Sequence, residues 1–249
     1  MRIAAVQCDI CWEDRAASLA RLEPMVSGAV GAGAELIVLP EMFAVGFSMD
    51  TDRVAEDEDG PTLAWLAGVA KDHGVAIGGS IPTRVATGGV HNRFVMATSE
   101  GSFSYDKVKP FSYSGEHERY QAGRGTVTWS VAGVRITPFV CYDLRFGDLW
   151  WHRAADTEIY LCVASWPASR RRHWEHLLIA RAIENQAWVV GCNRVGEGGG
   201  QDYAGGSMVV DPTGEVVAAA SDTEEVLLAD IDPALTHRVR EEYPFLPDR

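Results

Sequence analysis

Three residues that suit nucleophilic chemistry stand at the ends of strand-like runs. They are Cys141 after residues 134–140, Glu41 after residues 36–40 and Lys107 after residues 103–106. Many α/β enzymes place their reactive groups where a buried strand ends and the chain turns outward. A cysteine needs a base or a nearby cation to raise its thiolate fraction. The sequence therefore predicts a cysteine nucleophile that is served by a glutamate and a lysine.

Alternatives to each assignment remain open from the residues alone. Glu41 is expected at a sheet edge, partly desolvated, although a carboxylate there also caps helices. Lys107 is suited to stabilising an oxyanion, but Lys109 is equally basic and is expected on the same side of an extended chain. Histidine is the usual partner of a catalytic cysteine, yet none of the seven histidines has a local signature of that role. Glu116 stands in a charged stretch, where a solvated loop is its default interpretation.

The elements that must position these residues alternate along the chain. Apolar periodicity predicts strands at 3–10, 36–39, 75–81, 93–99, 101–106, 126–131, 134–141, 159–164, 188–193, 207–210 and 225–230. It predicts helices at 16–32, 62–73, 147–155 and 173–186, with Pro24 expected to kink or start the first. Residues 196–200 are predicted to be a flexible loop, because they lack the Lys-Ser/Thr ending of a phosphate-binding loop. No linker divides the chain, so residues 1–249 are expected to form a single domain.

Composition excludes several classes of protein. The 249 residues are 47% hydrophobic and 23% charged, as in a globular protein, and the net charge of −13 argues against a nucleic-acid partner. No run of about 18 apolar residues predicts a membrane span, and no signal peptide is recognised, so a cytoplasmic protein is expected. Cys8 and Cys11 have the spacing of half a zinc site, but no second pair completes it, so we predict no metal. Cys162 and Cys192 are expected in the core.

Six short motifs, in order, resemble the nitrilase or carbon–nitrogen hydrolase superfamily from Arg2 to the end of the chain. The three main ones are Leu39-Pro40-Glu41-Met42-Phe43, Tyr105-Asp106-Lys107-Val108-Lys109-Pro110-Phe111 and Cys141-Tyr142-Asp143-Leu144-Arg145-Phe146. The supporting ones are Ala164-Ser165-Trp166-Pro167, residues 181–186 and Gly205-Gly206-Ser207. Each motif is weak alone, but their shared order is specific.

The resemblance implies a role for each matching residue. Cys141 becomes the nucleophile, Glu41 the general base and Glu116 a second glutamate that supports the lysine. That lysine is Lys107, because Lys109 stands where the family usually has histidine. The backbone N–H of Tyr142 completes an oxyanion hole. No metal or organic cofactor is implied.

Within the superfamily the chain most resembles the ω-amidase-like branch, in its compact length, its segment 116–123 and its ending 240–246. Such enzymes hydrolyse 2-oxo-dicarboxylate monoamides such as 2-oxoglutaramate and release ammonia through a thioester. The substrate carboxylate needs a cation, and Arg145 or Lys109 is the candidate. Arg145 is equally consistent with a structural salt bridge behind Cys141. Phe43 and Trp166 are further candidates for contact with the substrate.

Several other functions stay open. An N-carbamoyl amino acid amidohydrolase, a deaminated-glutathione amidase or a nitrilase would use the same Glu-Lys-Cys site. A different class of protein would be a non-catalytic binding scaffold, or a redox or metal-binding thiol protein that uses Cys8 and Cys11.

The resemblance also implies an architecture. It is a four-layer α-β-β-α sandwich in which two αββα protomers form a homodimer through their helices. Residues 232–249 are expected to be an extension that reaches across the dimer, because an exposed aromatic tail is otherwise an apolar liability.

Overall fold

The computed structural model describes residues 1–248 and contains two mixed β-sheets. The first sheet has the strand order β15-β1-β2-β4-β5-β6, with the short β3 beside β4. Its strands are β15 (Glu225–Asp230), β1 (Arg2–Gln7), β2 (Leu36–Val38), β3 (Glu56–Asp57), β4 (Ala76–Arg84), β5 (Val90–Thr98) and β6 (Gly101–Asp106). The second sheet has the order β14-β13-β10-β9-β8-β7. Its strands are β14 (Val216–Ala219), β13 (Met208–Val210), β10 (Trp188–Asn193), β9 (Ile159–Ala164), β8 (Val134–Val140) and β7 (Trp129–Val131).

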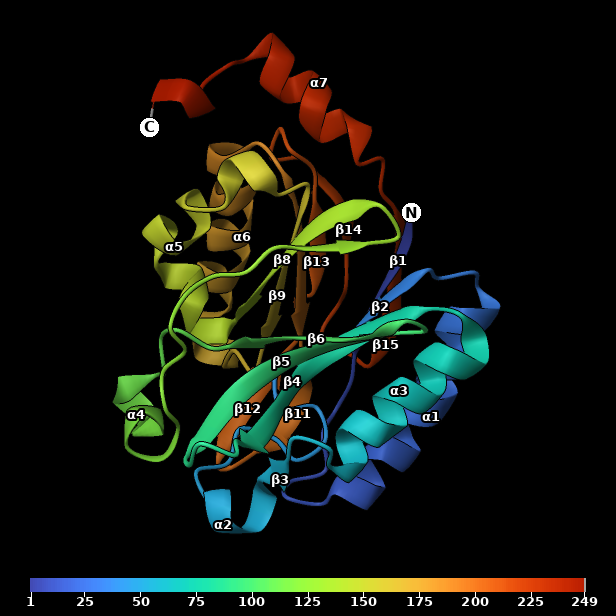
Figure 1. Cartoon of the computed structure of the whole chain (residues 1–249), viewed down its shortest axis with the longest axis vertical. Helices are drawn as coiled ribbons and strands as arrows, with labels where there is room; N and C mark the ends of the chain where they lie inside the picture. The colour runs from blue at the N-terminus through green and yellow to red at the C-terminus, as the bar shows by residue number, and fades with distance from the viewer. Residues whose placement is uncertain (249) are drawn as a thin grey trace.

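Helices cover the outer face of each sheet. α1 (Arg15–Gly31) and α3 (Pro61–His73) lie together on the first sheet, whereas α5 (Gly147–Trp151) and α6 (Arg171–Asn185) lie beside the second (Figure 1). α2 (Thr51–Val54), α4 (Glu116–Arg119) and α7 (Ala234–Glu242) are shorter. The protomer therefore has the α-β-β-α layers that the sequence predicts. Among residues 1–248, no helix is long and apolar enough to cross a membrane.

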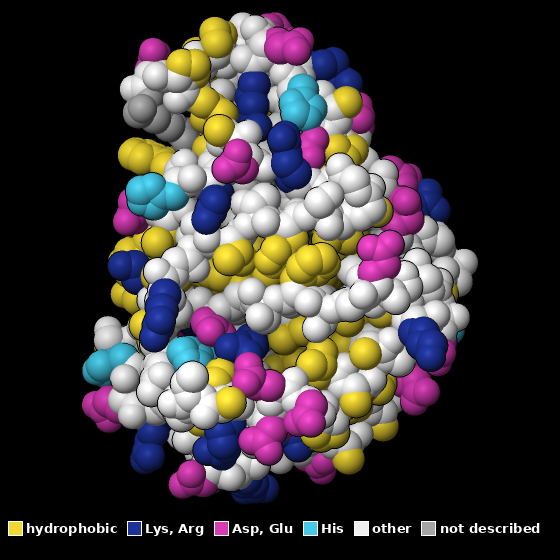
Figure 2. Space-filling model, viewed as in Figure 1, with side chains coloured by type: hydrophobic (Ala, Val, Ile, Leu, Met, Phe, Trp, Pro, Cys, Tyr) yellow, Lys and Arg dark blue, Asp and Glu magenta, His cyan; other side chains and the backbone are white. Residues whose placement is uncertain are grey.

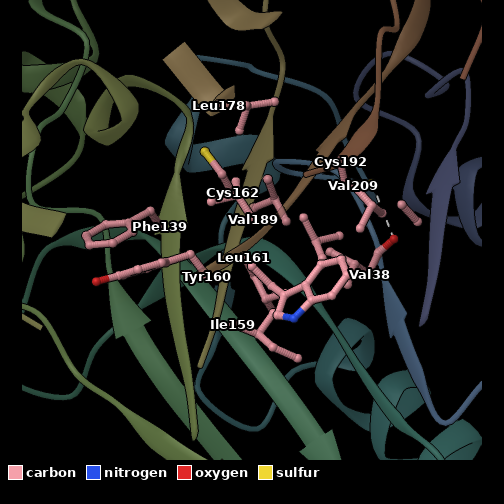
Figure 3. Close-up of a cluster of buried hydrophobic side chains, with 14 of the residues drawn as sticks. Val38, Phe139, Ile159, Tyr160, Leu161, Cys162, Leu178, Val189, Cys192 and Val209 are labelled. Atoms are coloured by element: carbon pink, nitrogen blue, oxygen red, sulfur yellow. Dashed lines mark hydrogen bonds between the residues drawn. The ribbon is translucent and has the colours of Figure 1, made fainter. Parts of the chain in front are cut away.

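Side chains alternate between the two faces of a strand, so the first sheet contributes to two hydrophobic cores. In β1, Ile3 and Ala5 belong to the core between the sheets, while Ala4 and Val6 face the helices α1 and α3. In β2 all three residues are buried, as expected of a wholly apolar strand. The predicted core cysteines Cys162 and Cys192 are both buried, and Cys192 faces the first sheet, with its Sγ 3.3 Å from the Val38 carbonyl oxygen of β2 (Figure 3).

Aromatic side chains pack together where β6, an edge strand of the first sheet, lies beside β7, an edge strand of the second. Phe103 of β6 stacks on Trp129 of β7 with ring centroids 5.5 Å apart. Figure 2 shows hydrophobic side chains in a band across the middle of this face, with charged groups above and below it.

Strand directions bring the candidate residues to the same edge. β1, β2 and β4 are parallel, and β5 is antiparallel to both β4 and β6, so β6 runs in the direction of β4. Lys107 and Glu41 therefore follow strands that end on one side of the first sheet. In the second sheet β8, β9 and β10 are parallel, so Cys141 and Ser165 share an edge as well.

Some predicted elements were wrong. Residues 196–200 do not form a loop but belong to a hairpin of β11 (Val195–Gly198) and β12 (Gln201–Ala204). Gly199 and Gly200 both have positive φ, 58° and 74°, which suits the two-residue turn of such a hairpin. α1 continues through Pro24 instead of starting there. β14 and α7 were not predicted, because β14 is mostly exposed and α7 buries only Thr236 and Val239.

Candidate active site

Cys141 occupies a strained turn at the end of β8. It opens a short 3₁₀-helix, Cys141–Arg145, with a φ of 46°, a left-handed conformation that non-glycine residues rarely adopt. Asp143 fixes this turn. Its carboxylate accepts the N–H of Val140 at 3.0 Å, the hydroxyl of Tyr105 at 2.9 Å and the N–H of Lys109 at 2.8 Å. Strain of this kind persists where surrounding contacts impose it, often at functional sites.

The environment of the Cys141 thiol favours its neutral form. Burial raises its pKa well above the ordinary value, the charge of Glu41 raises it further, and the charge of Lys107 opposes both. The thiol is 9% exposed. It therefore carries its proton at neutral pH, and any reaction of the sulfur as a thiolate needs a base to remove that proton.

Glu41 lies beyond the end of β2 and is fully buried. Its Oε1 accepts the Lys107 Nζ at 2.9 Å and the Asn92 Nδ2 at 2.8 Å. Its Oε2 accepts the backbone N–H of Ser165 at 2.8 Å, which ties the first sheet to the second. Three donors, from β5 and from the ends of β6 and β9, thus hold this carboxylate in place. Glu41 caps no helix within residues 1–248, and its carboxylate is fixed beside Lys107.

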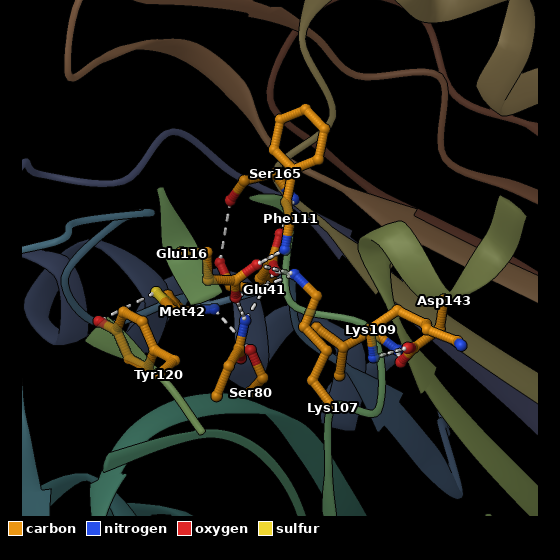
Figure 4. A network of polar contacts seen from close by, with 12 residues as sticks. Glu41, Met42, Ser80, Lys107, Lys109, Phe111, Glu116, Tyr120, Asp143 and Ser165 are labelled. Atoms are coloured by element: carbon orange, nitrogen blue, oxygen red, sulfur yellow. Dashed lines mark hydrogen bonds and ion pairs between the residues drawn. The ribbon is translucent and has the colours of Figure 1, made fainter. Parts of the chain in front are cut away.

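Lys107 and Glu116 form a buried ion pair beside Glu41. Lys107 Nζ lies 2.8 Å and 3.0 Å from the two carboxylate oxygens of Glu116 (Figure 4). Burial lowers the pKa of Lys107, but the two carboxylates outweigh it and hold the pKa well above its ordinary value. Glu116 is fully buried at the start of α4, so its default interpretation as a solvated loop residue was wrong.

Lys109 does not join this cluster. Figure 4 shows its side chain turned away from the glutamates, while Lys107 points between them. The ammonium group of Lys109 lies over the ring of Phe146, 4.7 Å from its centroid. The two lysines therefore occupy different environments, and only Lys107 contacts the carboxylates.

A cavity of about 460 Å³ opens beside Cys141. Segments 12–13, 47–50, 111–114, 141–145, 165–170 and 198–203 contribute to its wall. Buried residues form its base, including Cys141, Ser165 and Trp166, whereas Tyr113 is exposed at its mouth. No histidine is among the lining residues, all of which lie within residues 1–248.

Of the four residues suggested for substrate contact, two line this cavity and two do not. Arg145 and Trp166 line it, and the Arg145 guanidinium lies 4.8 Å from the Trp166 ring. Lys109 and Phe43 do not line it, and Phe43 lies in the core against Trp65, with ring centroids 6.2 Å apart. Tyr142, whose N–H was predicted to bind an oxyanion, is also in the wall. That N–H lies in the first turn of its helix, where no internal acceptor exists.

Arg145 has no carboxylate partner among residues 1–248. Its Nη2 lies 3.1 Å from Nδ1 of His173 on α6, and it forms no ion pair with an aspartate or glutamate in that part of the chain. The structure thus provides no salt bridge behind Cys141 to explain this residue. Its charge is available to a ligand in the cavity.

Sequence reasoning missed two groups that complete the site. Asn92 in β5 donates one hydrogen bond to Glu41 and another, at 3.0 Å, to Glu116, so it spaces the two carboxylates. The predicted strand began at residue 93, one residue too late to include it. The backbone N–H of Ser165 was also missed, because a main-chain donor leaves no sign in the sequence. Asn92 stands between His91 and Arg93, so no local pattern singles it out.

Comparison with known proteins gives close relatives over the whole chain. Omega-amidase YafV of Escherichia coli (strain K12) is 38% identical over 253 residues, which cover 100% of this chain and 96% of that protein. A 2-oxoglutaramate amidase of Bacillus subtilis (strain 168) is 32% identical and covers 99% of this chain and 96% of its own length.

Solved structures agree with this result. A CN-hydrolase superfamily protein of Xanthomonas campestris, with an arsenic adduct in its active site, has a TM-score of 0.95 and 38% identity, covering 100% of this chain and 97% of that one. Saccharomyces cerevisiae Nit3, from branch 10 of the nitrilase superfamily, has a TM-score of 0.89 and 26% identity, covering 98% and 94%. The carbon-nitrogen hydrolase family model matches residues 2–241. This chain therefore belongs to the carbon-nitrogen hydrolase family.

Proposed function

We propose that this amidase is an ω-amidase, which hydrolyses the terminal amide of short 2-oxo-dicarboxylate monoamides such as 2-oxoglutaramate. The observation that carries the proposal is Arg145, a cation without a carboxylate partner among residues 1–248, in the wall that also holds Cys141. A guanidinium binds a carboxylate strongly and directionally. The relatives named an omega-amidase and a 2-oxoglutaramate amidase support the same substrate class.

In the first half of the proposed reaction, Glu41 takes the proton of the Cys141 thiol as the sulfur attacks the amide carbon. The oxyanion that develops is stabilised by the N–H of Tyr142 and by the charge of Lys107. Lys107 already donates to Glu41 and Glu116, so its main contribution is its positive charge. Protonated Glu41 then delivers the proton to the departing nitrogen, which leaves as ammonia, and a thioester remains.

In the second half, Glu41 removes a proton from water, which attacks the thioester carbon. The thiolate leaves and recovers its proton from Glu41, and the acid is released. Glu116 and Asn92 contribute by holding Lys107 and Glu41 in place. No metal or organic cofactor is needed for any of these steps.

The test compares three amides of one chain length: 2-oxoglutaramate, glutaramate without the 2-oxo group, and uncharged pentanamide. We expect the wild-type protein to release ammonia from glutaramate with a kcat/KM at least tenfold above that for pentanamide. Arg145→Gln should lower kcat/KM for glutaramate by about 10- to 100-fold, because a charge-assisted hydrogen bond is worth about 1.5–3 kcal/mol. It should change the value for pentanamide much less.

Two results would count against the proposal. One is a wild-type enzyme that prefers carbamoyl amino acids, nitriles or pentanamide, which would favour one of the related activities. The other is an equal loss for both amides in Arg145→Gln, which would show that the guanidinium shapes the site without binding the carboxylate. A redox role for Cys8 has less support, since burial raises the pKa of its thiol to about 12.

We also infer that the protein is a homodimer that associates through its helix layer. Trp151 of α5 is 50% exposed and Ile183 of α6 is 52% exposed, which is unusual for large apolar side chains. Sedimentation should give twice the 27.1 kDa mass of the chain, and Trp151→Glu should shift it toward the monomer. A wild-type protein that sediments as a monomer at micromolar concentration would contradict this inference. Crossing of the dimer by residues 232–249 stays a prediction.

A further inference from the structure

Tyr203 of the hairpin strand β12 is held rigidly in the wall of the cavity. It is 6% exposed, and the Arg194 guanidinium lies 4.4 Å from its ring centroid. Arg194 is itself buried and donates to Asp9 Oδ1 at 2.9 Å and to the carbonyl of Glu197 at 3.0 Å. The Arg194 guanidinium thus packs against the Tyr203 ring, and its own hydrogen bonds hold the guanidinium in place.

The hydroxyl of Tyr203 makes no hydrogen bond within residues 1–248. Burial raises its pKa to about 12, Arg194 opposes that shift, and the charges of Glu41 and Cys141 add to it. The hydroxyl is therefore protonated at any physiological pH and close enough to the reacting groups to feel their charges. The hydroxyl is not among the fully buried atoms that lack a partner, so it opens onto the cavity that Tyr203 lines, where it can donate to a ligand.

The other buried side-chain donors in the wall already have acceptors, apart from the reacting thiol. The Ser48 hydroxyl donates to Glu13 Oε1 at 2.6 Å, and the Ser165 hydroxyl donates to the Glu41 carbonyl at 3.2 Å. The Trp166 indole N–H donates to the Arg170 carbonyl at 2.9 Å. Among the buried residues of the wall, Tyr203 is the one whose hydroxyl has no acceptor within residues 1–248 and opens onto the cavity.

The polar groups of the proposed substrate can be assigned in the same way. The amide oxygen faces the Tyr142 N–H and Lys107, and the carboxylate faces Arg145. The 2-oxo oxygen is a neutral acceptor, which suits a neutral hydroxyl better than a cation. We propose that the Tyr203 hydroxyl donates a hydrogen bond to the 2-oxo oxygen and so selects 2-oxo acid amides over their deoxy analogues. This assignment rests on the ω-amidase function proposed above.

Tyr203→Phe tests the assignment, because it removes the hydroxyl and keeps the ring against Arg194. We expect kcat/KM for 2-oxoglutaramate to fall about tenfold or more relative to the wild type, as for loss of a buried hydrogen bond. The value for glutaramate, which has no 2-oxo group, should change less than about twofold. For each substrate, the kcat/KM of the variant is divided by that of the wild type. Any property of the substrate in solution affects both values equally and does not change this ratio.

Tyr113→Phe is the matched control, because Tyr113 lines the same cavity but is exposed to water. It should leave both values unchanged, and the melting temperature of Tyr203→Phe should match the wild type. Equal losses for the two amides in Tyr203→Phe, or no loss for either, would overturn the assignment and leave the ω-amidase proposal standing. A wild-type protein that is inactive on both amides would instead overturn the proposed function.

Discussion

Cys141→Ala should abolish ammonia release, with a loss in kcat of roughly 10⁵- to 10⁶-fold, as for other enzymes that lose their nucleophile. Without the sulfur no thioester forms, and nothing in the described cavity wall replaces it. The fold should survive, since the side chain is small and lies at the cavity surface. Steady-state ammonia release from glutaramate, with circular dichroism to verify folding, measures both effects.

Cys11→Ala is the matched control for that experiment. Cys11 is also a free thiol, but it is half-buried and does not line the cavity. We expect its removal to change kcat/KM less than about twofold. Normal turnover by Cys141→Ala, or inactivation by Cys11→Ala, would show that the nucleophile has been misassigned.

Lys107→Met should impair both activity and stability. The variant leaves Glu41 and Glu116 buried beside each other without their shared cation. Breaking a buried ion pair by removing one partner costs about 3–5 kcal/mol, because the remaining charge is uncompensated. Loss of the oxyanion charge should also cut kcat by about 10²- to 10³-fold or more. Urea titration and ammonia release measure the two effects separately.

Lys109→Met is the control, because it removes the same charge two residues further on. Its ammonium group faces the Phe146 ring, a contact worth about 0.5–1 kcal/mol at an exposed site. We expect a stability loss of that size and a kcat close to wild type. If Lys109→Met were instead the more damaging change, the assignment of the catalytic lysine would be wrong.

Strand ends were the part of the site that could be predicted from the residues. Cys141, Glu41 and Lys107 each follow a strand-like run, and parallel strands bring such residues to a common edge. The layered fold followed from the same alternation of apolar strands and helices, together with the family resemblance. Local patterns were sufficient here because β1 and β2 are buried on both faces.

The rest of the site depends on contacts that local patterns do not encode. Glu116 stands among charged residues, and only the family resemblance, not the local pattern, placed it beside Lys107, where the fold has it buried. Lys107 and Lys109 are alike in sequence, but Asp143 accepts the N–H of Lys109, and that lysine's side chain turns toward Phe146. Tyr203 was overlooked because the glycines before it were taken for a loop, although they build the hairpin that carries it.

The hydrogen bond from the Ser165 N–H to Glu41 joins residues that are 124 positions apart and belong to different sheets. The thiol and its base thus come from opposite halves of the chain. Neither half alone brings this thiol and this carboxylate together, so the pair exists only when the second sheet is docked on the first. Amide turnover therefore reports on that docking as well as on the formation of each sheet.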